Sequence, residues 1–175
     1  MDSSDCHAVA VAFLNAGSAF GDPAAAAQWW AAVHREAAGA LPLQAGSKPR
    51  FDSALAEELR ALQAASTQAL DGVSNGRRPP ESSLATVSRA LARGTMGLDG
   101  ARPGLTYAVA DGAGSVLLPL AYAISSLLAA DLRRLRRCAD EQCAAYFWDN
   151  TKNRSRRWCR LACMERVRAP RRRLP

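Results

Sequence analysis

Apolar residues recur every three or four positions along three stretches of the chain, which is the pattern of helices with one buried face. The first stretch covers residues 22–39 and opens with Asp22 and Pro23, which suit the N-cap and the first helical position. The second and third cover residues 52–72 and 81–93. The apolar positions on the three faces are Trp29, Trp30, Val33, Ala37, Leu55, Leu59, Leu62, Leu70, Leu84, Val87, Ala90 and Leu91.

Residues 1–20 have a less regular pattern. Val9, Val11 and Phe13 alternate as in a strand, whereas Val9, Ala12 and Phe13 share one face of a helix. The pattern leaves both readings open.

A small β-hairpin is predicted over residues 105–118. Residues 105–110 are rich in β-type residues, and the Asp-Gly-Ala-Gly sequence at 111–114 is a turn signal. Residues 115–118 are then expected to form the partner strand. From Pro119 the leucine spacing predicts a helix that leads directly to Cys138.

The composition supports a mainly helical protein with that hairpin, an α+β chain. Hydrophobic residues make up 49% of the 175 residues but aromatic residues only 6%, which suits alanine-packed helices. No apolar run approaches the ~18–20 residues that span a bilayer, and no hydrophobic signal segment is seen. The longest run, residues 116–128, is interrupted by Pro119 and two serines. We expect a cytoplasmic protein with no membrane association.

Charge divides the chain unevenly. Residues 133–175 contain 14 Lys+Arg and 4 Asp+Glu, a net charge of +10, whereas the other 132 residues contain 9 and 12, a net charge of −3. A basic segment of this kind favours a polyanionic partner. We therefore predict two domains, residues 1–132 and 133–175.

Four of the five cysteines lie in the basic segment, at Cys138, Cys143, Cys159 and Cys163. Two close pairs separated by 15 residues suit a tetrahedral thiolate site for zinc. If all four sulfurs bind the metal, no coordination position is open and the zinc is structural. Disulfides, an iron–sulfur cluster or no metal at all are the alternatives for the same cysteines.

The residues around these cysteines resemble a known family. The pattern C-x4-C-x3-F-x-D-x-[ST]-K-N-x-S-R-R-W-C-x3-C is similar to that of the zinc finger named after its Cys-Gly-Asn-Arg tetrapeptide (CGNR). The tetrapeptide itself reads Cys-Met-Glu-Arg here, over residues 163–166. The matching positions are Cys138, Cys143, Phe147, Asp149, Lys152, Asn153, Ser155, Arg156, Arg157, Trp158, Cys159 and Cys163.

The resemblance implies a bacterial stress-induced transcription regulator. In that family an ABATE-like domain precedes the finger, and its looser match here rests on Phe13-Leu14-Asn15 and Trp29-Trp30. We expect residues 1–132 to sense a small-molecule effector or form a homodimer. Residues 133–175 are expected to form a treble-clef-like finger with structural Zn²⁺ and a basic tail, which binds DNA.

Basic side chains in the finger are the candidate nucleic-acid contacts, because arginine and lysine neutralise phosphates and arginine pairs with guanine edges. A solvated basic surface is the alternative. Arg171, Arg172 and Arg173 follow Pro170 and suit a basic arm. The candidates within the finger are Lys152, Arg154, Arg156, Arg157, Arg160, Arg166 and Arg168.

Other residues have two readings each. Tyr146, Phe147 and Trp158 could stack on bases, although Phe147 and Trp158 are better explained as the finger's small core. Asp149 is expected to cap the turn before Thr151 and not to bind metal.

In the first domain, Asn15, Trp29 and Trp30 could line a ligand pocket or simply pack. The Cys6-His7 pair has no accompanying catalytic constellation, so no enzymatic activity is expected. The main hypothesis is a DNA-binding regulator. An RNA- or ribosome-associated protein and a redox-responsive interaction module, in which the zinc thiolates are oxidised, remain alternatives.

Overall fold

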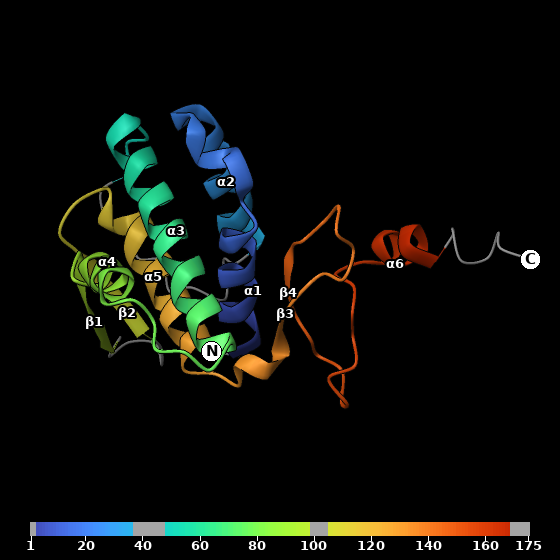
Figure 1. Ribbon diagram of the computed structural model, residues 1–175. Coiled ribbons are helices and arrows are strands. Elements are labelled where there is room, and N and C mark those ends of the chain that lie inside the picture. The colour runs from blue at the N-terminus through green and yellow to red at the C-terminus, as the bar shows by residue number, and fades with distance from the viewer. Residues whose placement is uncertain (1–2, 37–47, 99–104, 169–175) are drawn as a thin grey trace, which may run out of the picture. The chain divides into compact units, whose positions relative to one another are not determined.

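The computed structural model describes residues 3–36, 48–98 and 105–168. The chain divides into two compact units, unit 1 over residues 1–130 and unit 2 over residues 131–175. Figure 1 shows the elements in chain order. The mainly helical class with small antiparallel hairpins agrees with the sequence prediction.

Unit 1 is built around α3, which contacts α1, α2, α4 and α5 (Figure 1). The predicted helices over residues 22–39, 52–72 and 81–93 are present, with ends that differ by a few residues; the predicted end near residue 39 lies outside the described residues. The elements of unit 1 are α1 (Ser3–Leu14), η1 (Gly17–Gly21), α2 (Pro23–Glu36), α3 (Ser53–Ser74), α4 (Glu81–Leu91), β1 (Gly94–Leu98), β2 (Leu105–Val109) and α5 (Gly114–Leu128).

Asp22 caps the start of α2, as predicted, and Asp52 does the same for α3. The Asp22 carboxylate accepts a hydrogen bond from the N–H of Ala25 at 2.8 Å. The Asp52 carboxylate accepts one from the N–H of Leu55 at 3.0 Å. Each side chain thereby satisfies an N–H that the helix itself leaves without a partner.

The ambiguous first stretch is a helix. Val9, Ala10, Phe13 and Leu14 are buried, whereas Val11 is only half-buried. Burial at two adjacent pairs four positions apart belongs to a helix face, and a strand would have buried every second residue.

One strand of the hairpin differs from the prediction. The partner of β2 is β1, with Gly94 opposite Val109 and Leu98 opposite Leu105. Residues 115–118 are the first turn of α5, so the prediction of a strand there was wrong. Asp111, expected in a hairpin turn, instead lies just before this helix, where its carboxylate accepts the N–H of Gly114 at 2.6 Å.

The last helix of unit 1 also differs from the prediction. α5 begins at Gly114, contains Pro119 and ends at Leu128, so it does not lead to Cys138. A short 3-10 turn, η2 (Leu132–Arg134), follows, with Asp131 as its cap. The Asp131 carboxylate accepts the N–H of Arg133 at 3.3 Å.

The core of unit 1 is centred on α5, whose residues 116–121 are all buried. One predicted core position was wrong, because Leu84 is 37% exposed. The buried positions of α4 are Ser83, Val87 and Ala90, a face rotated by about one residue. Ser83 is accommodated there because its hydroxyl donates to Gln68 Oε1 at 2.9 Å. Among the described helices, none is long and apolar enough to cross a membrane.

A four-cysteine metal centre

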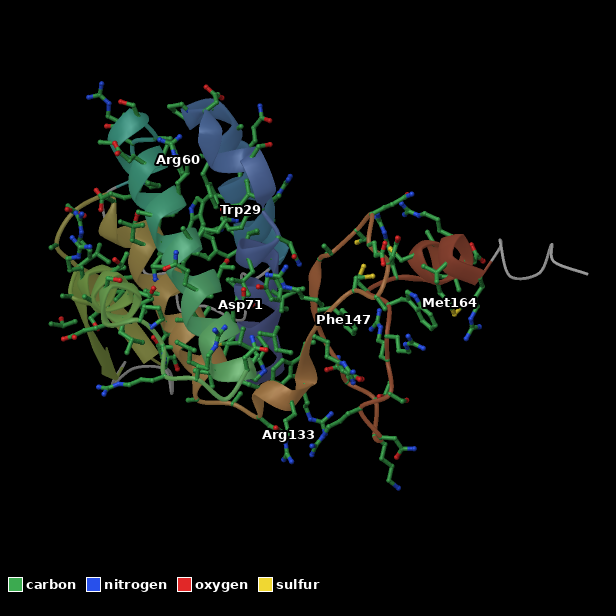
Figure 2. The ribbon with its side chains drawn as sticks, in the orientation of Figure 1. Trp29, Arg60, Asp71, Arg133, Phe147 and Met164 are labelled. Carbon is green, nitrogen blue, oxygen red and sulfur yellow. The ribbon has the colours of Figure 1, made fainter. Side chains whose placement is uncertain are left out.

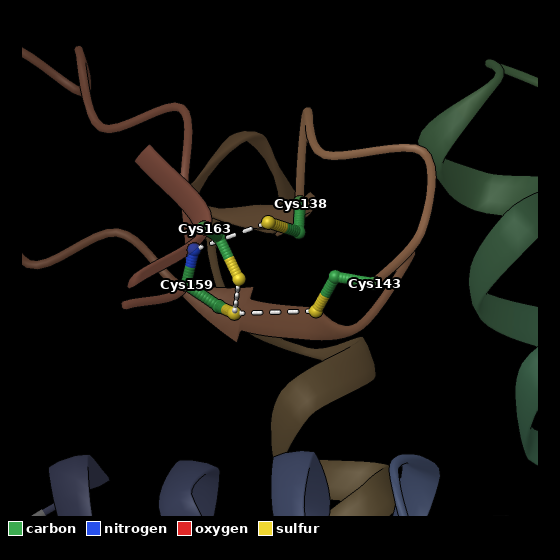
Figure 3. Close-up of side chains that lie close together, drawn as sticks. All are labelled: Cys138, Cys143, Cys159 and Cys163. Atoms are coloured by element: carbon green, nitrogen blue, oxygen red, sulfur yellow. Dashed lines mark hydrogen bonds between the residues drawn. The ribbon is translucent and has the colours of Figure 1, made fainter. Parts of the chain in front are cut away.

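Unit 2 brings its cysteines together with a short hairpin and one helix. β3 (Leu135–Arg137) pairs antiparallel with β4 (Tyr146–Trp148), with Arg137 opposite Tyr146. Cys138 directly follows β3, and Cys143 lies in the connection to β4. Cys163 lies on α6 (Leu161–Arg168), two positions into the helix, and Cys159 lies just before it (Figure 3).

The connection between the first two cysteines is a compact turn. The carbonyl of Asp140 accepts the N–H of Cys143 at 2.9 Å and that of Ala144 at 3.1 Å. Ala144 has φ 48°, a left-handed conformation, and the N–H of Cys138 donates to Ala145 at 2.8 Å. This turn brings the sulfurs of Cys138 and Cys143 to one site.

The four sulfurs lie within 4.8 Å of one another. Cys159 Sγ is 3.6 Å from Cys143 Sγ and 3.7 Å from Cys163 Sγ (Figure 3). A tetrahedral zinc with ~2.3 Å bonds separates its sulfurs by about 3.8 Å, which the observed spacing matches. None of these four cysteines forms a disulfide, so the disulfide alternative fails in this structure. A site with four thiolate ligands has no open position, and the zinc it holds is structural.

The sequence comparison agrees with this geometry. Residues 134–174 match the CGNR zinc finger family. The match covers the finger and its basic tail and leaves the ABATE-like domain as a prediction from resemblance. A comparison with curated proteins gave no match. The finger therefore has both the family pattern and the metal-binding geometry.

The environment of the thiols is not uniform. A hydrogen bond from the backbone at Ala145 is the main cause that lowers the pKa of Cys143. Burial, together with the neighbouring cysteines, raises the pKa of Cys159 to about 12. The N–H of Cys159 also points at Cys138 Sγ, at 3.5 Å, as expected for a thiolate ligand that accepts backbone hydrogen bonds.

Asp149 caps the turn of the finger, as the sequence predicted. It is fully buried, and its Oδ1 accepts both the N–H of Thr151 at 2.9 Å and the Thr151 hydroxyl at 2.6 Å. Its Oδ2 accepts the N–H of Arg156 at 2.9 Å. Burial alone would raise the pKa of Asp149, but these hydrogen bonds outweigh it and lower the pKa.

Arg156 is exposed, but its side chain is hydrogen-bonded within the finger. Its Nε donates to the carbonyl of Trp158 at 2.9 Å, and its guanidinium also donates to the carbonyl of Cys159. The same guanidinium lies 5.4 Å from the centre of the Phe147 ring. Arg156 therefore holds the segment that carries Cys159, although the sequence suggested it as a nucleic-acid contact.

Three other candidate contacts also have partners inside unit 2. Arg154 forms an ion pair with Asp131 at 3.2 Å. Arg160 is hydrogen-bonded to the Cys163 sulfur, which raises the pKa of the guanidinium. Arg166 forms an ion pair with Asp140 at 3.3 Å.

The remaining candidates, Lys152, Arg157 and Arg168, are exposed. Arg157 and Arg168 lie 5.4 and 5.1 Å from the centre of the Trp158 ring. Residues 171–173, the predicted basic arm, lie outside the described residues.

The aromatic side chains of the finger are core residues partly covered by arginine. Phe147, labelled in Figure 2, is 5% exposed and Tyr146 is 8% exposed. The Arg137 guanidinium lies 4.6 Å from the Tyr146 ring. Trp158 is half-buried beside Arg157 and Arg168.

Several structural residues were missed from the sequence. Arg134 donates to the carbonyls of Asp149 at 3.0 Å and Thr151 at 3.1 Å, and Arg136 donates to that of Arg154 at 2.7 Å. These bonds go to backbone carbonyls, which leave no trace in residue identity. Asp140 could have been suspected, because an aspartate two residues after a cysteine suits a tight turn.

The candidate pocket residues of unit 1 occupy three different settings. The Trp29 ring, labelled in Figure 2, packs at 5.0 Å from Phe20 and 5.9 Å from Phe13. Trp30 is 7% exposed, with its ring 5.9 Å from that of His34. Asn15 is exposed. The two tryptophans thus act in helix packing.

Proposed function

We propose that the finger binds nucleic acid, with duplex DNA as the preferred partner, and that the chain is a transcription regulator of the stress-induced type. The observation that carries the proposal is the structural zinc finger, matched over residues 134–174, which contains the chain's whole excess of positive charge. A metal-fixed framework holds cations at set positions, and fixed cations neutralise phosphates with a defined register.

The side chains offered to phosphates are Lys152, Arg157 and Arg168. All three are exposed, and none of the ion pairs among the described residues involves them. By contrast, Arg154, Arg156, Arg160 and Arg166 have partners within the finger. This division narrows the seven sequence candidates to three principal contacts.

The covered aromatic rings favour duplex over single-stranded partners. Recognition of unpaired bases usually requires an open aromatic face on which a base can stack. Tyr146 and Phe147 are buried, and arginines already lie against their rings and against Trp158. A finger built in this way binds through its cations and not through stacking.

In this proposal unit 1 senses a small effector or forms a homodimer, and the chain has no catalytic role. One support is a cavity of about 160 Å³ lined by residues of α3, α4 and α5, which include Arg89, Leu62, Leu117 and the ion pair of Arg93 with Glu58. A molecule with a charged group and a small apolar part has the matching chemistry.

The test is binding of the zinc-loaded full chain to duplex DNA, single-stranded DNA and single-stranded RNA of equal length, between 50 and 200 mM salt. The variant Arg157→Gln/Arg168→Gln should weaken duplex binding and lower the salt slope by about 2, because each phosphate contact contributes about 0.9. Arg77→Gln/Arg78→Gln, which removes two exposed arginines of unit 1, is the matched control and should leave the slope unchanged.

Selection from fragmented genomic DNA, with RNA as competitor, then tests sequence preference. Discrete sites that survive competition support a regulator. Tighter binding to single-stranded RNA than to duplex DNA would favour the RNA-associated alternative. Absence of binding at 50 mM salt would reject nucleic acid altogether and leave the protein-interaction module.

A further inference from the structure

The helix that supplies the fourth zinc ligand has little packing of its own. α6 has eight residues, and Cys163 is its one buried residue. Leu161, at the start of the helix, is 63% exposed. Hydrophobic burial therefore contributes little to the stability of α6. Polar contacts must hold this helix in position when zinc is absent or dissociates.

Arg166 provides such a contact. It lies three positions after Cys163, so both side chains project from the same side of α6. Its Nε is 3.3 Å from Asp140 Oδ2, and its Nη1 donates to Gln142 Oε1 at 3.1 Å. Both partners belong to the turn between Cys138 and Cys143, so one arginine joins the helix of the fourth ligand to the turn of the first two.

The partner carboxylate is buried. Asp140 is 3% exposed, and its Oδ1 accepts the N–H of Gln142 at 3.2 Å. Its Oδ2 is buried and accepts no hydrogen bond from the described residues. A buried carboxylate is costly unless a cation balances it, and the ion pair with Arg166 supplies that balance.

We propose that Arg166 and Asp140 form a clamp that positions the zinc ligands, and that Arg166 acts in metal retention and not in nucleic-acid contact. In this proposal two residues of the tetrapeptide over residues 163–166, the first and the last, have a role at the metal site. Cys163 binds the metal. Arg166, one helical turn later, connects α6 to the turn that carries the ligands Cys138 and Cys143. Met164 and Glu165 between them make no contact that the clamp needs. The inference depends on the zinc site alone and is independent of the proposed DNA binding.

The test measures zinc affinity of the full chain by competition with a chromophoric chelator, and zinc release by stopped flow. Arg166→Gln and Asp140→Asn should each weaken zinc binding by about tenfold or more, as removal of a residue that orients metal ligands typically does. The double variant should be weaker by less than the product of the two single effects, because the second change removes a contact that is already broken.

Two further variants separate the clamp from a general effect of charge. Arg168→Gln removes an equal charge from the same helix and should change zinc affinity by less than about twofold. Arg166→Lys keeps the charge but lacks the fork that reaches both Asp140 and Gln142, so it should weaken binding almost as much as Arg166→Gln. Far-UV circular dichroism at saturating zinc checks that each variant folds.

Wild-type affinity in Arg166→Lys, or equal losses in Arg166→Gln and Arg168→Gln, would show that only positive charge near the thiolates matters and would overturn the clamp. Strictly multiplicative effects in the double variant would do the same. If the clamp fails, the duplex-binding measurements on Arg157 and Arg168 are unaffected.

Discussion

Asp149 organises the finger by satisfying three donors with one side chain. Its two oxygens accept hydrogen bonds from the N–H and the hydroxyl of Thr151 and from the N–H of Arg156. The carboxylate thereby closes the turn over residues 149–156. Arg156 then continues the path by donating to the carbonyl of Cys159. A chain of hydrogen bonds thus runs from a buried aspartate to a zinc ligand.

Replacement of Asp149 by alanine should destabilise the zinc-loaded finger by about 1–3 kcal/mol, because three partly buried hydrogen bonds lose their acceptor. The expected result is weaker zinc binding in chelator competition. Asn150→Ala, an exposed neighbour, is the control and should behave as the wild type. Equal affinities for the two variants would show that the turn forms without the carboxylate.

Zinc affinity should fall steeply in acid. Burial raises the pKa of Cys159 to about 12, so this thiol is protonated at neutral pH without metal and must lose its proton to bind. Zinc binding therefore releases protons, and affinity rises with pH. Chelator competition between pH 6 and 7.5 should show a loss of at least about tenfold for each unit of decreasing pH. A flat profile would contradict thiolate ligation.

At the scale of elements, the hairpin of unit 1 depends on close approach between two strands. A Cβ built on Gly94 would lie 2.4 Å from the carbonyl oxygen of Ala108 and 3.0 Å from Val109 Cα. Both atoms belong to the backbone, so the clash cannot be relieved by rotation of a side chain.

Gly94→Ala should therefore lower the free energy of unfolding of unit 1 by about 1–3 kcal/mol, as overpacking does elsewhere. Gly21→Ala is the matched control, because its Cβ would meet nothing within 4 Å. Urea unfolding followed by circular dichroism gives both values. A neutral Gly94→Ala would show that the strands can move apart.

The sequence predicted the periodic elements well and the local exceptions poorly. The helix starts at Asp22 and Asp52 were recognised because a cap is written in the sequence itself. The zinc ligands were recognised because metal chemistry fixes residue type and spacing. The turn at Asp111 could not be assigned, because Asp-Gly suits both a hairpin and the segment before a helix, and the pairing of β2 with β1 is a non-local contact that this turn sequence does not encode.

The arginines of the finger show the same limit. Charge and density predicted a basic surface, but which guanidiniums bond within the finger depends on carbonyls and buried carboxylates that meet only in the folded unit. Arg154, Arg156 and Arg166 could not be told apart from Arg157 and Arg168 by residue type.

At the scale of the whole molecule, the two units are stabilised by different means. Unit 1 has an extended apolar core centred on α5, whereas unit 2 has a few buried side chains around its cysteines. Small modules of the second kind fold with their metal.

A strong chelator should therefore unfold unit 2 and leave unit 1 largely helical. We expect a small change in far-UV circular dichroism, a large change in fluorescence of Trp148 and Trp158, and recovery of both on return of zinc. The variant Trp29→Phe/Trp30→Phe reduces the background from unit 1. Complete loss of helicity on chelation would show that unit 1 also requires the metal.

Removal of residues 134–175 should abolish duplex binding, because the remaining residues 1–133 carry 10 Lys+Arg and 12 Asp+Glu, a net charge of −2. Fluorescence anisotropy with a labelled duplex is the measurement. Binding with an undiminished salt slope by the truncated chain would place the contact in unit 1.

The division of labour among the arginines makes the two properties of the finger separable in a cell. A triple variant, Lys152→Gln/Arg157→Gln/Arg168→Gln, should keep its zinc and its fold but lose nucleic-acid binding. Arg156 and Arg166, which bond within the finger, are unchanged in it. Cells that express this folded variant can be compared with cells that express the wild-type protein. Phenotypes that differ between them require the three exposed cations of the finger, and phenotypes that do not differ require only the folded protein.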